Sequence, residues 1–463
     1  MNKSIHVNIN GTVVLAKAGT LLSDILDIEK PCGGKGSCGK CRVRVNGRDE
    51  LACRYVITSN IEVVAPQREE ILSETGITPE SDNRGRLCLA LDVGTTTLAL
   101  ALVSLDKKKT LKVITTTNPQ RRFGADVISR IEHCQQHSVK ALHDTLIQEI
   151  NRMIGTLGVT VETMYVSANV TMLHTFFGVD CSSIGVAPYT PVFLESKRER
   201  GEALGLLGVE HVISLPSIST FVGADVVAGL HLVGMPSTGK YNLLLDLGTN
   251  AEIVLYSNRS GAATAAAAGP CFEGANIGCG MSATKGAIHA FRLNYGCAEW
   301  ETVEHAPPRG ICGTGLIDLV AELLKNGILD ETGYMAEDYQ ICEGVFLSPE
   351  DVRQYQSAKA AVYSAILTLM KTEGVSFHDI EHMYISGGFS ARINIANAAV
   401  SGLLPGELVH KAVALNNSSL RGTVKYACEG GDLSPFTEGI RSVDLSSHPD
   451  FSDLFVEHMS FEA

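Results

Sequence analysis

Two stretches of the sequence repeat one pattern, and this repeat constrains the fold more than any other feature. The first, LCLALDVGTTTLALALVSL at residues 87–105, is an apolar strand, a turn that begins after Asp92, and a second apolar strand. The second, NLLLDLGTNAEIVLY at residues 242–256, has the same layout around Asp246. A glycine turn with adjacent N–H and hydroxyl groups can wrap a phosphate, and a carboxylate beside it can hold Mg²⁺ through water. The repeat therefore predicts a duplicated βββαβα architecture whose two lobes close on one nucleotide.

Each turn supplies candidate phosphate-binding residues, and a third element supplies a candidate adenosine site. Asp92 and Asp246 are the candidate catalytic carboxylates. The residues expected to contact phosphate are Gly94, Thr95, Thr96, Thr97, Gly248, Thr249 and Asn250. The stretch at 381–405 gives a strand, the pair Gly387–Gly388 and a helix, and such a pair lets a backbone pass flat against an adenosine. No G-x4-G-K-[ST] stretch occurs, which excludes a Walker-A protein.

Four cysteines near the N-terminus form a second pattern, Cys32-x5-Cys38-x2-Cys41-x11-Cys53, in a glycine-rich loop. Four thiolates can hold a 2Fe-2S cluster, and the glycines let N–H groups approach the sulfurs. A zinc site is the alternative, but it usually takes two short C-x2–4-C pairs, and only one is present. A four-iron cluster is disfavoured because its compact C-x2-C-x2-C run is absent. The stretch CGGKGSCGKC is similar to the cluster loop of 2Fe-2S ferredoxins, although its spacings differ from the plant type.

The rest of the first 66 residues indicates a small β-rich unit. Asn10 and Gly11 predict a type I′ turn between two strands, because both central positions of that turn need positive φ. Thr20 is expected to cap a short helix with one apolar face. The alternating stretch CRVRVNG and the strand NIEVVAP complete an order typical of a β-grasp domain.

Composition excludes other classes of protein. The chain has 38 basic and 51 acidic side chains, a formal net charge of -13, and no basic run, so a nucleic-acid partner is not expected. The N-terminal MNKSIHVNIN has no apolar signal stretch, and no segment reaches ~18 uninterrupted apolar residues, so we expect a cytoplasmic protein without a membrane partner. Thirteen cysteines in such a chain indicate metal ligands or buried thiols, and the nine outside the loop are expected to be buried.

The nucleotide motifs resemble those of the superfamily of acetate and sugar kinases, heat-shock chaperones and actin. DVGTTT is similar to its first phosphate motif, DLGTN to its second and ISGGFS to its adenosine motif. Three further stretches resemble the reductive activators of corrinoid-dependent enzymes: SISTFVGADVVAGL (217–230), AGPCFEGANIGCGMSATKGAI (268–288) and RGICGTGLIDLVAELLKNGILD (309–330). That family fuses a 2Fe-2S ferredoxin-like domain to an ATPase of this fold, and the resemblance covers essentially the whole chain.

The resemblance implies roles for further residues and a domain organisation. Gly223 and Asp225 would lie near the γ-phosphate, with Asp225 orienting an attacking water, and Gly269 and Gly274 would cap the ribose and phosphate side. The expected fold class is an α+β β-grasp ferredoxin-like domain followed by an α/β two-lobed actin-like ATPase. The expected boundaries are 1–66 for the ferredoxin-like domain, 67–86 for a linker, 87–241 for lobe I, and 242–463 for lobe II with the C-terminal tail.

Two features depart from the family pattern. Larger members carry a middle domain between cluster and ATPase, whereas only about twenty linker residues are expected at that place. Another branch carries C-terminal four-iron clusters, whereas the tail after Gly431 has no cysteine. The sequence therefore indicates the ATPase and electron-transfer chemistry more clearly than the way in which the corrinoid partner is bound.

The implied function is ATP-dependent reductive activation of a corrinoid protein. One electron would pass through the 2Fe-2S cluster to inactive Co(II), returning it to methyl-accepting Co(I). The implied cofactors are the cluster, ATP and Mg²⁺, and the implied partners are a corrinoid protein of a methyltransferase system and an upstream low-potential electron donor; a homodimer is an allowed assembly. Two alternatives stay open: an ATP-driven electron donor to a different enzyme, and a small-molecule kinase with an accessory cluster.

Overall fold

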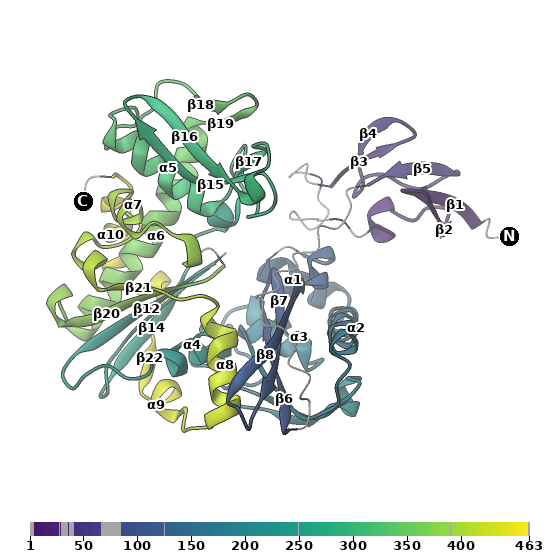
Figure 1. The fold of residues 1–463 in the computed structure, drawn as a ribbon, viewed down its shortest axis with the longest axis horizontal. Coiled ribbons are helices and arrows are strands. Elements are labelled where there is room, and N and C mark those ends of the chain that lie inside the picture. The colour runs from purple at the N-terminus through teal and green to yellow at the C-terminus, as the bar shows by residue number, and fades with distance from the viewer. Residues whose placement is uncertain are drawn as a thin grey trace. The chain divides into compact units, whose positions relative to one another are not determined.

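The computed structural model describes residues 4–26, 28, 36, 41–65, 85–124, 126–248, 250–388 and 390–461 (Figure 1). The chain forms two compact units, with the boundary between Leu215 and Pro216. Among the helices of the described residues, none has the length and apolar composition that a membrane span requires. The predicted linker, 67–86, lies almost entirely outside the described residues.

Residues 4–65 contain a five-stranded sheet in the order β2-β1-β5-β3-β4. Its strands are β1 (Ser4–Ile9), β2 (Thr12–Lys17), β3 (Arg42–Val45), β4 (Arg48–Leu51) and β5 (Ile61–Val64). The turn at Asn10 and Gly11 has φ values of 49° and 90°, as the hairpin prediction requires. β1 pairs in parallel with β5, and inward-facing residues of the sheet, among them Val7 and Val63, form a separate hydrophobic core.

The short helix predicted after the first hairpin is present as a 3-10 helix, but its predicted cap is wrong. A single 3-10 turn, η1 (Leu22–Asp24), stands there, and its N-cap is Leu21 rather than Thr20. The backbone N–H of Leu22 donates to the Tyr55 carbonyl at 2.8 Å, so a distant segment takes the hydrogen bond that a cap would have satisfied. Tertiary pairing therefore replaces local capping at this position.

The remainder of the first unit is built on a six-stranded sheet in the order β10-β11-β9-β6-β7-β8. β6, β7 and β8 form an antiparallel meander, and β9 and β11 follow in parallel on the other side of β6. The strands are β6 (Leu87–Val93), β7 (Thr97–Ser104), β8 (Lys109–Thr117), β9 (Val161–Ala168), β10 (Arg198–Arg200) and β11 (Val209–Ser214). The helices are α1 (Val127–Gln136), α2 (Lys140–Leu157) and α3 (Val170–Phe176).

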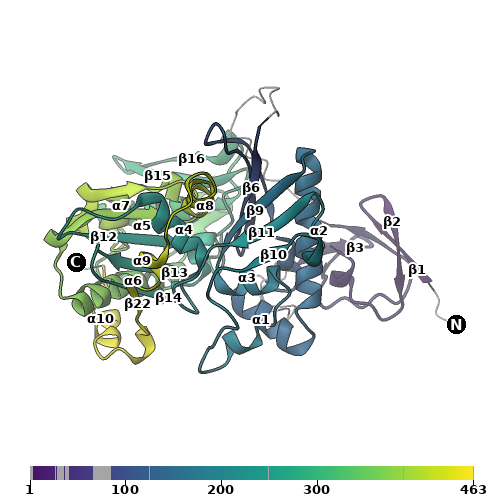
Figure 2. The same cartoon turned by 90° about the horizontal axis from the view of Figure 1, so that it is seen from below.

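The second unit repeats this design with the order β21-β20-β12-β13-β14-β22. Figure 2 labels four strands of this sheet, β12, β13, β14 and β22. Its strands are β12 (Tyr241–Leu247), β13 (Ala251–Tyr256), β14 (Gly261–Ala266), β20 (Ile380–Ser386), β21 (Ala412–Ala414) and β22 (Ile440–Ser442). β12 to β14 form the meander, and β20 and β21 follow in parallel, as β9 and β11 do in the first unit. This correspondence confirms the predicted duplication.

Two smaller sheets and seven helices complete the described part of the second unit. The small sheets contain β15 (Ala287–Asn294), β16 (Cys297–Thr302) and β17 (Gly310–Ile311), and β18 (Tyr339–Cys342) with β19 (Val345–Leu347). The helices are α4 (Ala224–Val233), α5 (Gly313–Lys325), α6 (Pro349–Glu373), α7 (Ile395–Val400), α8 (Ser418–Glu429), α9 (Ser434–Thr437) and α10 (Phe451–Glu457). α4 and α8 pack together, and a Cβ on Gly422 of α8 would lie 1.8 Å from the Ala228 carbonyl oxygen of α4.

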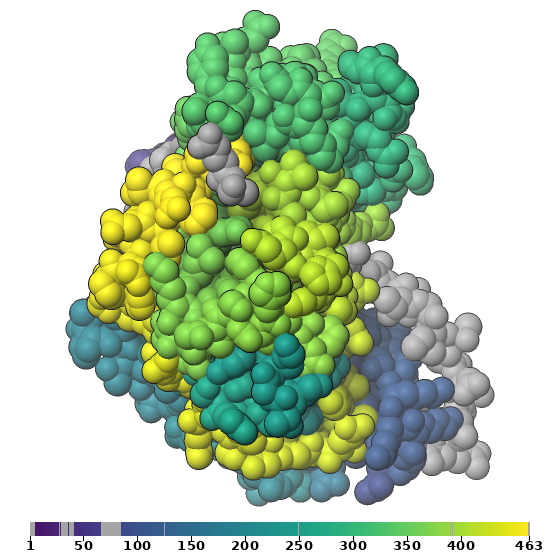
Figure 3. Space-filling view, turned by 90° about the vertical axis from the view of Figure 1, so that its left-hand side faces the viewer, coloured from purple at the N-terminus to yellow at the C-terminus, as the bar shows by residue number. Residues whose placement is uncertain are grey.

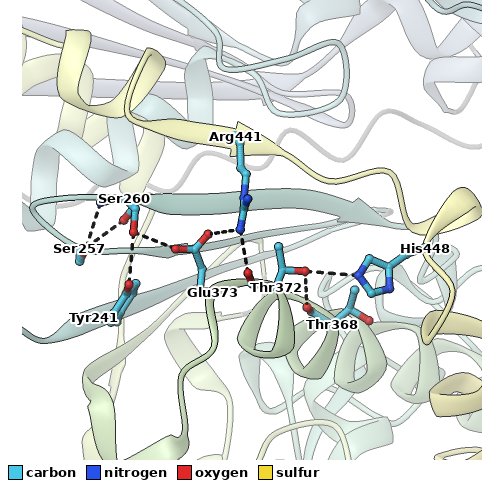
Figure 4. Close-up of polar contacts among 8 residues, drawn as sticks. All are labelled: Tyr241, Ser257, Ser260, Thr368, Thr372, Glu373, Arg441 and His448. Atoms are coloured by element: carbon cyan, nitrogen blue, oxygen red, sulfur yellow. Dashed lines mark hydrogen bonds and ion pairs between the residues drawn. The ribbon is translucent and has the colours of Figure 1, made fainter.

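The C-terminal segment, from β22 to residue 461, runs back over this unit, and its helix α10 lies against α6 (Figure 3). A polar network fixes it at the end of α6 (Figure 4). Glu373, whose side chain is 5% exposed, pairs with Arg441 at 2.9 Å and accepts a hydrogen bond from Ser260 Oγ at 2.8 Å. His448 lies 3.4 Å from Thr372 Oγ1 in the same network. The tail is therefore part of the folded unit.

Candidate functional site

The first candidate phosphate turn lies at the end of β6. Asp92 is half-buried and faces Ala99 of β7 on one side and Ser167 of β9 on the other, at the carboxyl end of the parallel strands. Gly94 follows, and a Cβ there would lie 2.6 Å from the Thr97 carbonyl oxygen. The turn is thus tight enough that only glycine fits, which is the geometry that exposes N–H groups to a phosphate.

Three buried or capping residues that the sequence analysis missed hold this turn. Asn118, fully buried, donates from Nδ2 to the Gly94 carbonyl at 2.8 Å. Arg130 of α1, also fully buried, donates to the Thr95 carbonyl at 2.5 Å. Asn169, the N-cap of α3, donates to Thr95 Oγ1 at 3.0 Å. Groups from three separate segments therefore fix the turn before any nucleotide binds.

The second candidate turn lies between β12 and β13. The N–H of Gly248 donates to the Asn250 carbonyl at 2.9 Å, which closes the turn, and Thr249 lies outside the described residues. Asp246 stands opposite Ser386 of the parallel strand β20. Burial raises the pKa of Asp246 to about 6, against a smaller lowering effect of its hydrogen bond with Ser386. The turn thus places a carboxylate where little water solvates it.

Further carboxylates of the second unit surround Asp246. Glu252 of β13 is its cross-strand partner. Burial and the nearby charges of Asp225 and Asp246, with a smaller effect of Glu273, raise the pKa of Glu252 well above its ordinary value. Glu273 Oε1 would lie 3.8 Å from a Cβ on Gly248, so it stands beside the phosphate turn. The hairpin register could have identified Glu252, since a three-residue turn places it opposite Asp246.

This arrangement fits Mg²⁺ held together with phosphate rather than by the protein alone. Within the described residues, no three histidine, cysteine or acidic side chains converge closely enough to hold a metal ion. Mg²⁺ usually keeps several waters and is bound through one or two carboxylates plus substrate phosphates. Asp246 and its acidic neighbours provide that kind of incomplete site.

The predicted adenosine element has two glycines in different environments. Gly387 follows β20 with φ of 108°, and a Cβ there would lie 2.0 Å from the Leu247 carbonyl oxygen of β12. Gly388 is exposed, and a Cβ there would meet nothing within 4 Å. The first glycine thus lets β20 approach β12, while the second leaves open space on which a flat ring system can lie.

The residues suggested by the resemblance also lie in the second unit. Gly223 is the N-cap of α4, and Asp225 is in its first turn, where it accepts the Val226 N–H at 2.9 Å. Gly269 and Gly274 flank a 3-10 turn, η5 (Pro270–Glu273), and both have positive φ. A Cβ on Gly274 would lie 2.4 Å from the Met281 carbonyl oxygen, so glycine is required at this position. Asp225 and the second turn are therefore brought together through their shared neighbour Glu252.

Two of the four candidate cluster ligands lie in the described residues. Cys41 and Cys53 are buried, and their sulfurs are 3.2 Å apart. Two sulfurs bonded tetrahedrally to one metal at ~2.3 Å lie about 3.7 Å apart, so a small adjustment would admit a metal between them. Cys32 and Cys38 lie outside the described residues. The thiols of Cys41 and Cys53 therefore fit an iron-sulfur cluster, and they would equally fit zinc.

The remaining nine cysteines only partly follow the expectation of burial. Cys297 is exposed, which corrects the prediction for that residue. Cys279, Cys342 and Cys428 are half-buried, and the other five are buried. Cys297 lies on β16, whose outer face is open to solvent, so its apolar sequence neighbours did not predict its environment.

The duplicated sheets with matching aspartate turns define the class of protein: an actin-like and sugar-kinase-like ATPase fold, known as ASKHA. Comparison with family models identifies the chain more narrowly. Residues 240–463 match the model described as the C-terminal domain of RACo, the ASKHA domain, and residues 87–238 match the RACo middle region. These two parts of the chain belong to the RACo family.

Similar proteins include two enzymes and one solved structure. The chain is 24% identical to the corrinoid activation enzyme RamQ of Eubacterium limosum, with 96% of each chain covered. It is 27% identical to the [Co(II) methylated amine-specific corrinoid protein] reductase of Methanosarcina barkeri, over 81% of this chain and 76% of that one. The structure of a reductive activator for corrinoid, iron-sulfur protein has the same fold, with a TM-score of 0.72, 24% identity and 98% of both chains covered.

The family match corrects one expectation from the sequence. The middle domain was expected to be missing, but residues 87–238 match the middle region. These residues contain all six strands of the larger sheet of the first unit, and also α4 of the second unit. The segment interpreted as one half of a duplicated core is therefore the middle region itself.

Proposed function

We propose that this chain is an ATP-dependent activator that reduces a corrinoid protein from Co(II) to Co(I) by one electron. The names of two similar proteins, a corrinoid activation enzyme and a Co(II) corrinoid protein reductase, support this assignment. The observation that carries it is the combination, on one chain, of a duplicated ASKHA-type core with two buried thiols whose sulfurs are 3.2 Å apart. A kinase needs no such thiols, and a simple electron carrier needs no such core.

In this proposal, Cys32, Cys38, Cys41 and Cys53 hold a 2Fe-2S cluster. When bound, such a cluster supplies one electron at a potential near roughly -400 mV. The burial of Cys41 and Cys53 excludes water from that side of the site, and low exposure is one of the factors that set the potential. The upstream electron donor and the corrinoid protein are the proposed partners.

The ATP site would use both aspartate turns. Asp92 and Asp246 would act on Mg-ATP through water, and the N–H and hydroxyl groups from Gly94 to Thr97 and from Gly248 to Asn250 would contact phosphate. Asp225 would orient the attacking water, with Gly223, Gly269 and Gly274 shaping the surrounding backbone. Gly387 and Gly388 would lie against the adenosine.

A physical reason connects the two activities. If the acceptor lies about 150 mV below the donor, one-electron transfer is uphill by on the order of 3.5 kcal/mol, at 59 mV per tenfold. Nucleotide binding can supply this difference only by favouring one conformation of the complex over another. A nucleotide-binding core is suited to that task if its ATP-bound and ATP-free conformations differ in affinity for the partner.

The test is an anaerobic ATPase assay with and without a purified Co(II) corrinoid protein. We expect the corrinoid protein to stimulate hydrolysis by wild type and by Cys53→Ser, while Asp92→Asn hydrolyses little in either condition. Stimulation only by some other low-potential enzyme, or phosphorylation of a small molecule, would replace the proposal by one of its alternatives.

A further inference from the structure

The last three residues that the structure describes, Met459, Ser460 and Phe461, are held by helix α6. Gln356 Nε2 donates a hydrogen bond to the Met459 carbonyl at 2.7 Å, and Lys359 Nζ donates one to the Ser460 carbonyl. Gln356 and Lys359 are each 1% exposed and lie three residues apart, on one face of α6. Buried donors therefore fix the position of this short segment along the helix.

The side chain of Phe461 is the apolar anchor of the segment. Its ring is buried and stacks on the ring of Tyr355, with centroids 6.3 Å apart and an interplanar angle of 30°. Lys359 Nζ lies 5.0 Å from the centroid of the Phe461 ring, which is within cation–π distance. The backbone N–H of Phe461 donates to the Glu331 carbonyl at 2.6 Å. Ring and backbone thus have separate partners, which together hold the ring against Tyr355.

Tyr355 connects this anchor to the nucleotide loop, residues 270–281. Tyr355 is fully buried, and its hydroxyl donates to Ser401 Oγ at 2.6 Å. Its ring also meets the ring of Phe272 edge-on, with centroids 5.7 Å apart and an interplanar angle of 83°. Phe272 lies in η5, the 3-10 turn between the two glycines expected at the ribose and phosphate side. Three buried rings therefore form one continuous contact from the C-terminal segment to the nucleotide loop.

Helix α6 holds the nucleotide loop at a second point. Asp351, one turn before Tyr355 on the helix, accepts the Gly278 N–H at 2.7 Å. Between these two contacts, Glu273 stands beside the second phosphate turn, because its Oε1 would lie 3.8 Å from a Cβ on Gly248. A shift of Tyr355 would therefore be passed to a loop residue that neighbours the expected phosphate position.

We propose that Phe461 is a positioning residue for nucleotide binding, which holds the nucleotide loop, through Tyr355, in the conformation that receives ATP. Four glycines lie in or directly before this loop: Gly269, Gly274, Gly278 and Gly280. Glycine loses more conformational freedom on ordering than other residues do. A loop that is ordered beforehand binds its ligand more tightly, because less of this entropy is lost on binding. The effect on ATP rests on the proposed function, whereas the ordering of the loop does not.

Hydrogen–deuterium exchange of the full chain without nucleotide tests the ordering. In Phe461→Ala, we expect amides of the nucleotide loop to exchange about tenfold faster than in wild type, the upper range of what one aromatic pair contributes. Peptides from 242–256 should keep their rates, which shows in the same sample that the second unit is folded. Wild-type exchange in the loop, or an equal rise in the loop and in 242–256, would overturn the proposal.

Three further variants separate the stacked ring from other effects. Phe461→Tyr keeps the ring and should exchange as wild type does. Phe451→Ala removes a half-buried ring of the same C-terminal segment, one that pairs with Phe455, and it should leave the loop protected. Phe461→Leu keeps an apolar side chain without a ring, so it should loosen the loop and takes the place of Phe461→Ala if that variant does not fold. Equal loosening in Phe451→Ala would assign the effect to general packing and refute the proposal.

Titration with ATP measures the consequence for binding in the same variants. Phe461→Ala should bind ATP about tenfold more weakly, with KM raised to the same extent and kcat within about twofold of wild type, because the ring acts on binding and not on the chemical step. Phe461→Tyr and Phe451→Ala should bind as wild type does. Equal affinity of Phe461→Ala and wild type would overturn the role in binding. A wild type that binds no ATP would refute the proposed function and this role with it, and the exchange measurement would still decide the ordering of the loop.

Discussion

Replacing Asp246 by asparagine should greatly slow hydrolysis and at the same time stabilise the nucleotide-free protein. In the native protein, burial raises the pKa of this carboxyl from 3.8 to about 6. At neutral pH the group is therefore ionised at a free-energy cost that the unfolded chain does not bear. Asparagine has nearly the same shape and cannot ionise, so the variant avoids this cost.

The size and the pH dependence of the effect follow from the pKa difference. A difference of about two in pKa corresponds to roughly 3 kcal/mol, from which the altered hydrogen bond to Ser386 subtracts about 1 kcal/mol. For an acid whose pKa is raised on folding, the cost is absent below the unfolded pKa, grows between about 4 and 6, and is complete above about 6. The free energy of unfolding of Asp246→Asn is thus expected to exceed that of wild type by about 2 kcal/mol at pH 7. This difference should shrink as the pH approaches 4.

The assay is unfolding by urea without nucleotide, at pH 7 and at pH 5, followed by ATP hydrolysis at pH 7. Asp338→Asn is the control, since Asp338 is exposed on the loop before β18. We expect hydrolysis by Asp246→Asn to fall about 100-fold or more, as when one preorganised group that balances transition-state charge is lost. A variant no more stable than wild type at pH 7, or a gain that does not depend on pH, would refute the reasoning.

Three further predictions concern other parts of the site. Gly387→Ala should lose nucleotide binding in a titration with ATP, because its Cβ would lie 2.0 Å from the Leu247 carbonyl oxygen. Gly388→Ala, whose Cβ would meet nothing within 4 Å, should fold normally. Equal behaviour of the two variants would contradict this geometry. Arg130→Met should raise the KM for ATP about tenfold, since the Thr95 carbonyl loses a charged donor worth about 1.5–3 kcal/mol, and an unchanged KM would show that the turn does not need it. Cys53→Ser should lose iron and labile sulfide in chemical analysis while keeping ATP hydrolysis; stoichiometric zinc in anaerobically prepared wild type would favour the alternative metal.

The parts of the fold that sequence could predict are those with local signals. Both aspartate turns lie between long apolar strands, and the Asn10–Gly11 hairpin depends on two residues that tolerate positive φ. Their spacing also indicated the duplication, which the two sheet orders confirm. These features are encoded within short windows, where strand periodicity and turn chemistry act directly.

The parts that sequence could not predict depend on contacts between distant segments. Asn118, Arg130 and Ser386 support the aspartate turns, but each is an ordinary polar residue in its own window. Leu21 replaces Thr20 as a cap because residues of the segment around Tyr55 take the hydrogen bonds. Such residues can be found only when the sheet register and the helix packing are known.

The most direct test of the account is formation of Co(I), followed by its absorbance after anaerobic mixing of the chemically reduced protein with a Co(II) corrinoid protein. Without nucleotide, we expect only a marginal amount of Co(I), and with Mg-ATP conversion of about half or more of the corrinoid, because ~4 kcal/mol changes an equilibrium about a thousandfold and slightly exceeds the uphill difference of about 3.5 kcal/mol. Asp92→Asn should keep the electron carrier and lose the effect of ATP, whereas Cys53→Ser should keep hydrolysis and deliver no electron. Equal and complete formation of Co(I) with and without Mg-ATP would contradict the account.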